Sequence, residues 1–472
     1  MSSLKENKMG VMPVGKLLFQ MALPLAISML VQALYNVVDS VFVSRISDEN
    51  NFALTAVSLA FPVQNIMIGI ATGVAVGVNA LGSRALGEKR QDYAGVIARN
   101  GLVLSVIGTI LAALFGLFGA EAFMRSQSSN EAVIAYGVDY IRIISIVSFG
   151  IFGTILMERL LQSTGRTKYT FYTQATGAVI NMILDPIFIF GLGPVPRMEV
   201  AGAAVATVIG QIVSLLLGIY LNLKKNPEIP LSFRKFRPDC KVIGKILGIG
   251  VPSMIMVAIG SLMYYTMNLI LGRFDALEAG LGETGSTAFG AYFKLQSFIF
   301  MPIFGLSNAL LAIVAYNYGA KKPDRIVKTI RCGCYAACGI MGVGLLLFQL
   351  FPEFLLGFFN PDEALLKVGV SALRTISLPF VLAGVCIIFG NVFQAMGKSV
   401  YSMVTSIARQ IGVLIPAAYL LSLTDNISAV WYAFPIAEIA SLTVSIWMMV
   451  SIYRKKIRPL RDSACNSQDE VV

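Results

Sequence analysis

The feature that most constrains this chain is a series of long apolar segments. Runs of about 18 or more apolar residues recur from Leu17 to Tyr453, and each can cross a hydrocarbon core of roughly 30 Å as a helix. Only 13% of the residues are charged, against roughly 25% in soluble proteins, and this deficit extends along the whole chain. The sequence therefore predicts an all-α polytopic membrane protein and not a soluble domain with one anchor.

We predict twelve transmembrane helices from these runs. The first 16 residues are basic and lead into an apolar segment of full spanning length, which favours a retained first helix over a cleaved signal. The approximate spans are 17–44, 53–82, 93–119, 131–162, 168–191, 200–223, 243–273, 287–316, 327–350, 366–394, 400–422 and 429–453.

The positions of lysine and arginine predict how these helices are oriented. If the amino end is inside, the inside loops hold 27 of the 37 basic residues and the outside loops hold 5. Cytoplasmic loops are the ones enriched in lysine and arginine. Both termini are therefore expected in the cytoplasm, which requires an even number of spans.

The chain also repeats itself at an interval of about 230 residues. Three pairs of stretches match in the same order: 24–45 with 252–273, 85–92 with 317–324, and 162–166 with 394–398. The repeat predicts two pseudo-symmetric six-helix lobes. They comprise residues 1–223 and 246–453, joined by a cytoplasmic loop at 224–245 and followed by a tail at 454–472. Secondary transporters commonly place their substrate site between such halves.

Composition argues against several classes of function. The net charge of +11 comes from basic residues in short loops, which is typical of topology determinants and not of nucleic-acid binding. The sequence contains no P-loop motif for ATP and no histidine for a catalytic pair, so neither an enzyme nor a cofactor is expected. Cys332, Cys334 and Cys338 are interpreted as small buried residues and not as a metal site.

Carboxylates inside the apolar segments are the candidate functional groups, because buried charge is costly in lipid and is usually functional. Asp39 has the spacing to share one helix face with three polar residues, Gln32, Tyr35 and Asn36. In the same way, Asn181 and Asp185 share a face, and Pro186 frees backbone carbonyls of the kind that often line cavities.

Three other charged residues lie within the spans. Glu158 lies near the inner end of the fourth span, where Arg159 and Arg142 are available partners. Glu438 lies in the twelfth span. Lys294, in the eighth, either binds substrate or pairs with an acid.

Asp39 and Asp185 are interpreted as a site for a coupling ion, H⁺ or Na⁺. Burial disfavours the charged form of a carboxylate, so proton or cation uptake relieves it. The structural alternative is that both carboxylates satisfy helix ends or pair with internal cations. Met267 and Ala417 stand at the matching positions of the second half, so this polar chemistry is concentrated in the amino-terminal half.

Six stretches together resemble the multidrug and toxic compound extrusion (MATE) family over nearly the whole chain: 24–39, 83–87, 162–166, 181–186, 201–207 and 315–320. The chain looks most similar to the DinF-like and MepA-like bacterial branches. The resemblance implies a monomer in the bacterial plasma (inner) membrane, surrounded by lipids. It also implies export of amphipathic, often cationic, small molecules against H⁺ or Na⁺ by alternating access.

By motif position, the resemblance implies a coupling site made of Asp39, Asn181, Asp185 and Thr207, which would be the metal ligands if the ion is Na⁺. Gln32, Tyr35 and Tyr140 would lie near this site. Met263, Lys294 and Gln296 would face a central cavity. Glu158 stands where relatives carry a neutral amide, which changes the charge expected near the site. The acidic cation site of the NorM-like branch has no matching acids in spans seven and ten.

Drug export has two rival functions. A flippase for a lipid-linked polysaccharide precursor would share the helix count and the duplicated plan. It would be expected to need a more cationic cavity than the basic residues within the spans provide, namely Arg142, Arg159, Lys294, Arg374 and Arg409. A membrane-embedded enzyme would need a catalytic cluster near an interface, and the sequence shows none.

Overall fold

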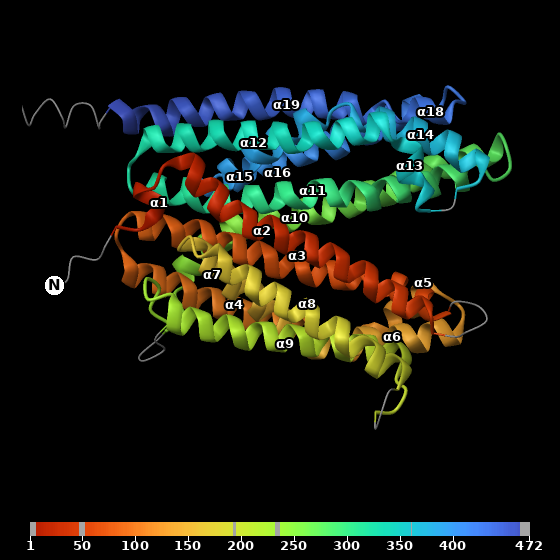
Figure 1. Ribbon diagram of the computed structural model, residues 1–472, viewed down its shortest axis with the longest axis horizontal. Coiled ribbons are helices and arrows are strands. Elements are labelled where there is room, and N and C mark those ends of the chain that lie inside the picture. The colour runs from red at the N-terminus through yellow and green to blue at the C-terminus, as the bar shows by residue number, and fades with distance from the viewer. Residues whose placement is uncertain (1–5, 47–51, 192–194, 232–236, 360, 463–472) are drawn as a thin grey trace, which may run out of the picture. The chain divides into compact units, whose positions relative to one another are not determined.

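A computed structural model describes residues 6–46, 52–191, 195–231, 237–359 and 361–462, and within these ranges the chain is helical with short connections (Figure 1). In this part of the chain, 10 helices are long and apolar enough to cross a membrane. Two bent helix pairs bring the number to as many as 12. The predicted all-α polytopic fold is therefore confirmed.

The chain forms two compact units. Unit 1 consists of Met1–Ala26 and Ile255–Val472, and unit 2 consists of Ile27–Met254. Both divisions fall inside continuous helices, α2 (Val14–Ser44) and α10 (Cys240–Gly272), just after a proline within each helix. The lobes predicted from the repeat divide the chain elsewhere, in the polar loop at 224–245.

Unit 2 is built from the second part of α2, the first part of α10 and the helices between them. These are α3 (Phe52–Gly87), α4 (Gln91–Phe118), α5 (Ala120–Gln127), α6 (Glu131–Ile146), α7 (Phe149–Ser163), α8 (Thr167–Phe190) and α9 (Glu199–Lys225). Alanines recur in its buried core, including Ala53, Ala56, Ala60, Ala203 and Ala204. Such residues let helices approach closely, which is how helices associate in lipid.

Unit 1 contains the remaining helices, several of which run side by side along its length (Figure 1). They are α1 (Lys8–Val11), η1 (Arg273–Ala276), α11 (Leu281–Gly319), α12 (Pro323–Leu350), α13 (Pro352–Gly357), α14 (Glu363–Ser377), α15 (Phe380–Ala395), α16 (Ser399–Ile407), η2 (Ala408–Leu414), α17 (Ile415–Ser422), α18 (Ile427–Val430), α19 (Ala433–Ile452) and η3 (Tyr453–Ile457). The elements η2 and η3 are π-helices.

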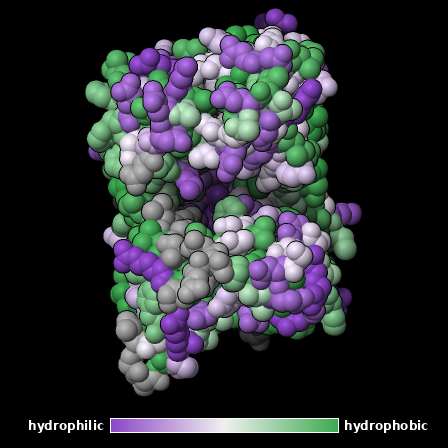
Figure 2. Space-filling model, turned by 90° about the vertical axis from the view of Figure 1, so that its right-hand side faces the viewer, coloured by the Kyte–Doolittle hydropathy of each residue, from purple (hydrophilic) through white to green (hydrophobic). Residues whose placement is uncertain are grey.

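Hydropathy is distributed along the helices as a membrane requires. Figure 2 looks onto the end that carries α13 and α18, where hydrophilic residues gather, while hydrophobic residues cover the flanks. On α4, for example, Leu111 is 61% exposed and Phe118 is 80% exposed. Such an apolar outer face is stable only against lipid or another apolar surface.

The backbone repeats in the two halves, as the sequence predicts. The fourth span bends by 47° between α6 and α7, and the tenth bends by 50° between α14 and α15. Gly165 and Gly397 both adopt positive φ, at 77° and 70°. Each donates its N–H to a carbonyl three residues back, and the next residue donates five residues back, which is the Schellman arrangement at a helix end. The predicted duplication is therefore visible at the level of hydrogen bonds.

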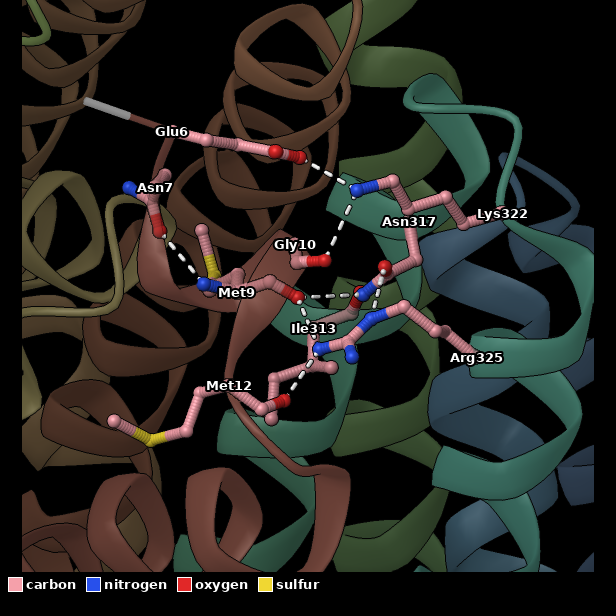
Figure 3. Close-up of polar contacts among 9 residues, drawn as sticks. All are labelled: Glu6, Asn7, Met9, Gly10, Met12, Ile313, Asn317, Lys322 and Arg325. Atoms are coloured by element: carbon pink, nitrogen blue, oxygen red, sulfur yellow. Dashed lines mark hydrogen bonds and ion pairs between the residues drawn. The ribbon is translucent and has the colours of Figure 1, made fainter. Parts of the chain in front are cut away.

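The amino-terminal segment Asn7–Met12 is bound to the helices α11 and α12 of unit 1 (Figure 3). Arg325 donates from Nη2 to the carbonyls of Met9 at 3.0 Å and Met12 at 2.8 Å. Asn317, which is fully buried, donates from Nδ2 to the Met9 carbonyl at 3.1 Å and accepts from Arg325 Nε at 3.1 Å. The segment is therefore held by its backbone, to which Lys322 also donates, at the Gly10 carbonyl, at 3.0 Å.

We expect the Arg325→Gln variant to expose this segment. Loss of two hydrogen bonds from a charged donor is expected to lower the local opening free energy by about 2 kcal/mol, or roughly 30-fold in exchange rate. Hydrogen exchange at the amides of Gly10 and Met12 measures this directly. Lys328→Gln, an exposed position on the same helix, is the matched control. Unchanged exchange in Arg325→Gln would contradict the assigned role.

Candidate ion-coupling site

Helices α8 and α9 approach each other closely because three glycines line their contact. A Cβ atom at Gly210 would lie 2.8 Å from the carbonyl oxygen of Gly177, and one at Gly202 would lie 2.6 Å from that of Phe188. Side chains at these positions would force the helices apart. This close approach lets short polar side chains on the two helices reach each other.

Three of the predicted site residues meet across this contact. The Nδ2 atom of Asn181 donates to Oγ1 of Thr207 on α9 at 3.2 Å and to Oδ1 of Asp185 on α8 at 3.3 Å. Asp185 is fully buried, and Asn181 and Thr207 are each 3% exposed. One amide therefore bridges the carboxylate and the hydroxyl that the sequence placed in a single site.

Helix α2 brings Tyr35 and Asp39 to the same place within unit 2. The phenol of Tyr35 lies beside the hydroxyl of Thr207 and interacts electrostatically with Asp39 and Asp185. The carboxylates of Asp39 and Asp185 are close enough to repel each other. The residues predicted for the ion site, Asp39, Asn181, Asp185 and Thr207, are thus assembled from three helices.

This cluster has a surplus of oxygen atoms that accept no hydrogen bond. In the part of the chain that is described, Asp39 Oδ1, Asp185 Oδ2 and Asn181 Oδ1 are buried without a donor. Buried acceptors of this kind cost free energy until a donor or a cation reaches them. Two carboxylates, an amide oxygen and a hydroxyl form a donor set that fits either a proton or Na⁺.

Tyr140 extends the cluster toward α3. Its side chain is 3% exposed, interacts electrostatically with Asp39, Tyr35 and Asp185, and donates its hydroxyl to Oε1 of Gln64 at 3.4 Å. Gln64 was not predicted from the sequence, although a polar residue inside an apolar span is a usable signal. Gln32 is exposed on α2, and the side chain of Asn36 lies outside the described residues.

The comparisons with known proteins bear on the whole chain. The family model described as MatE matches residues 24–187 and 252–420. The chain belongs to the MatE family. The two matched stretches begin at Pro24 and Pro252, so the family match follows the internal repeat.

Relatives of this MatE protein match it over most of their length. A relative named FAD transporter, from Shewanella oneidensis, is 26% identical and aligns over 90% of this chain and 92% of its own. A relative named multidrug export protein MepA, from Staphylococcus aureus, is 22% identical over 90% and 91% of the two chains. The predicted resemblance to MATE proteins and to a MepA-like branch is therefore confirmed.

Solved structures show the same fold. A transporter of the MOP superfamily from Pyrococcus furiosus superimposes with a TM-score of 0.88 at 24% identity. The match covers 96% of this chain and 100% of that one. At this level of identity the likeness shows the fold alone, which agrees with the two repeated halves described above.

In this MatE protein Glu158 lies apart from the candidate ion site. Its Oε1 accepts from Thr173 Oγ1 at 2.9 Å and its Oε2 accepts from Gln174 Nε2 at 2.8 Å, so both oxygens bind α8. These partners precede Asp185 by about 17 Å along the helix axis. The carboxylate therefore fastens α7 to α8 near one end of the unit.

We expect Glu158→Gln to reduce stability more than transport. The substituted amide keeps one acceptor but places a donor against the amide of Gln174 or the hydroxyl of Thr173. Loss of one buried charged hydrogen bond is expected to cost about 1–3 kcal/mol. Thermal unfolding of the purified protein measures the cost, with Glu278→Gln as an exposed control. A complete loss of export in a stable Glu158→Gln protein would place Glu158 in the ion pathway instead.

The residues predicted to face a cavity from the second half all lie in unit 1. Met263 is buried on α10, whereas Lys294 is exposed and Gln296 is half-buried on α11. The ammonium of Lys294 lies 5.9 Å from the ring centroid of Phe359. Glu438, on α19, pairs with Arg409 of η2, whose Nη1 lies 3.1 Å from Glu438 Oε2. The sequence analysis named both charges but did not pair them.

Proposed function

We propose that this MatE protein is an antiporter that exports amphipathic, often cationic, compounds in exchange for H⁺ or Na⁺. The single observation that carries the proposal is the group of unpartnered buried oxygens on Asp39, Asn181 and Asp185. A bundle that needed only stability would not retain two buried carboxylates and an amide oxygen without donors. The coupling ion, the cytoplasmic termini, the bacterial inner membrane and a monomeric state belong to the same proposal.

The mechanism follows from competition for the carboxylates. With no ion bound, Asp39 and Asp185 repel each other and attract a cationic substrate. Uptake of a proton or Na⁺ removes that attraction and lets α2 pack against α8 and α9. Substrate release is thus linked to ion uptake. The ion-free carboxylates favour the substrate, and the ion-bound carboxylates do not.

The membrane potential supplies the driving force. An inward potential of 100 mV provides roughly 2.3 kcal/mol for each charge moved. This supports a substrate gradient of roughly 50-fold for one net charge per cycle. Coupling through two carboxylates is therefore sufficient for useful drug export without ATP.

An anionic substrate is a second candidate, which a different observation favours. The relative from Shewanella oneidensis is named an FAD transporter, and FAD carries phosphate groups. In unit 1, the Arg409 side chain is 33% exposed although it lies within a predicted span. The flippase alternative is not favoured by the comparisons, whose named relatives are a drug exporter and a flavin nucleotide transporter.

Ethidium efflux from a drug-sensitive bacterium that expresses the chain tests the first proposal. We expect wild-type protein to export ethidium and Asp39→Asn to lose export at equal membrane abundance. Asp139→Asn, an exposed carboxylate on α6, is the matched control and should export normally. Failure of the wild type to export any of a panel of cationic and zwitterionic drugs would overturn the multidrug function.

A further inference from the structure

The arginine of the unit 1 ion pair lies in the middle of its span. Arg409 follows the start of the 24-residue span Ser399–Ser422 by ten residues, and it binds Glu438, which follows the start of α19 by five. At 1.5 Å per residue Arg409 lies about 15 Å from one helix end and about 20 Å from the other, near the centre of a core about 30 Å thick. Charges at this depth are costly and are usually kept for function.

The pair is incompletely satisfied for a purely structural bridge. The Glu438 side chain is 8% exposed, and its Oε1 has no hydrogen-bond partner among the residues described. Arg409 reaches that carboxylate with Nη1 alone. A guanidinium has five N–H donors and favours a bidentate carboxylate when the bridge is built for stability. With a third of its side chain exposed, Arg409 retains donors for another anion.

The surroundings of the pair add no competing carboxylate. The phenol of Tyr292 and the thiol of Cys386 interact with both charges, and the hydroxyls of Ser441 and Ser445 lie beside that thiol. Among the described residues, no three acidic, cysteine or histidine side chains gather as they would at a metal site. The groups nearest Arg409 are therefore neutral apart from Glu438, so an incoming anion meets one competitor.

The duplicated plan places the ion pair on the helices that match those of the candidate ion site, with Arg409 eight residues, about 12 Å, before Ala417, the position that matches Asp185. Asp185, Asn181 and Thr207 lie on α8 and α9, the fifth and sixth spans of the first half. Arg409 and Glu438 lie on the fifth and sixth spans of the second half, on η2 and α19. On these equivalent spans the first half thus carries the carboxylate of Asp185, whereas the second half carries a guanidinium paired with Glu438.

The backbone at Arg409 is also specialised. Ala408–Leu414 forms a π-helix in the middle of the span. Single π-helical turns are uncommon and occur frequently at functional sites, because they rotate side chains out of the regular register. A π-turn that carries an incompletely paired arginine is a second, independent indication of a binding site.

We propose that Arg409 is the anion-binding subsite of unit 1 and takes the phosphate group of an amphipathic substrate, with Glu438 as its resident counter-ion. In the empty state Glu438 neutralises Arg409. A phosphate displaces the carboxylate by forming the two parallel N–H···O bonds that the present single contact leaves unused. The displaced Glu438 then faces the phenol of Tyr292. The biological meaning of this proposal rests on the proposed export function. Its test is a binding measurement that does not depend on export.

A matched pair of ligands tests it on the purified full-length protein. Riboflavin and riboflavin 5′-phosphate share one ring system and differ by the phosphate alone. Binding is followed by flavin fluorescence anisotropy without any ion gradient. We expect wild-type protein to bind the phosphate form about tenfold more tightly, the effect of one charge-assisted contact. Equal binding of the two forms, or no binding of the phosphate form, would overturn the proposal.

Substitutions of the pair should act in opposite directions. Arg409→Gln should abolish the preference for the phosphate form, whereas Glu438→Gln should increase it, because the competing carboxylate is gone. A structural bridge predicts the reverse for Glu438→Gln, which would then weaken binding as Arg409→Gln does. The double variant Arg409→Gln/Glu438→Gln leaves no unpaired charge to destabilise the fold, and it should show no preference. Arg374→Gln, at an exposed arginine on α14, should bind as wild type does.

Two further measurements distinguish the possible explanations of the binding result. Phosphatidylglycerol added to the detergent micelles shows whether the phosphate comes from a lipid headgroup, since it would then compete with riboflavin 5′-phosphate through Arg409. Ethidium export is measured on the same wild-type preparation after reconstitution. Loss of the phosphate preference with intact ethidium export overturns the subsite alone, whereas absent export with intact preference overturns the proposed drug function alone.

Discussion

The Asp185→Asn variant is expected to export substrate no faster with an ion gradient than without one. The amide has the shape of the carboxylate, so the contact with Asn181 can be kept by rotation, but the amide can neither release a proton nor neutralise Na⁺. The variant should therefore lose the substrate concentration gradient that one coupled charge supports, which is roughly 50-fold at 100 mV. Substrate accumulation in reconstituted vesicles measures this value.

The same vesicles identify the coupling ion. A pH gradient and a Na⁺ gradient are imposed separately, and whichever one drives the wild type should have no effect on Asp185→Asn. Asp139→Asn keeps the fold and the buried pair, so it should respond as the wild type does. A stimulated Asp185→Asn protein would mean that the structural alternative for this carboxylate is correct.

Replacing Gly210 with valine is expected to destabilise unit 2 by about 2–3 kcal/mol. A Cβ atom there would lie 2.8 Å from the Gly177 carbonyl and 3.3 Å from Cβ of Asn181, and neither the backbone nor the short side chain can move aside easily. The helices α8 and α9 must separate, which lengthens the 3.2 Å bond between Asn181 and Thr207. Thermal unfolding and ion-driven export should therefore both decrease.

Gly339→Val is the control for this change. Gly339 lies within α12, where an added Cβ would meet nothing within 4 Å. The intrinsic helix preferences of the two substitutions are the same, so only packing distinguishes them. Equal loss of stability in both variants would show that the contact between α8 and α9 tolerates a larger residue.

The sequence was sufficient for the helices and for their duplication. Apolar length determines the spans, and Gly165 and Gly397 mark equivalent helix ends because both need the left-handed conformation. The common face of Asn181 and Asp185 also follows from their spacing, because residues four apart are neighbours on a helix. These features depend on local geometry, which one sequence contains.

Contacts between helices were beyond direct inference from the residues. The bond from Asn181 to Thr207 depends on how closely α8 and α9 cross, and only the resemblance to a family suggested Thr207. Glu158 was expected near the site, yet Thr173 and Gln174 bind it elsewhere on α8, because α7 packs beside their end of that helix. The pairing of Arg409 with Glu438 likewise needs the fold, since 29 residues separate them.

The division of the chain inside α2 and α10 has a consequence for how such a protein could have arisen. Each compact unit is completed by half a helix encoded in the other copy of the repeat: residues up to Ala26 in one case and residues up to Met254 in the other. This is the topology of reciprocal segment exchange between identical protomers. A single-copy protein of this topology would meet the same requirement as a dimer that exchanges these segments, which one fused chain holds together. Cutting the present chain in its polar linker would therefore yield two fragments that each lack a piece of their own core.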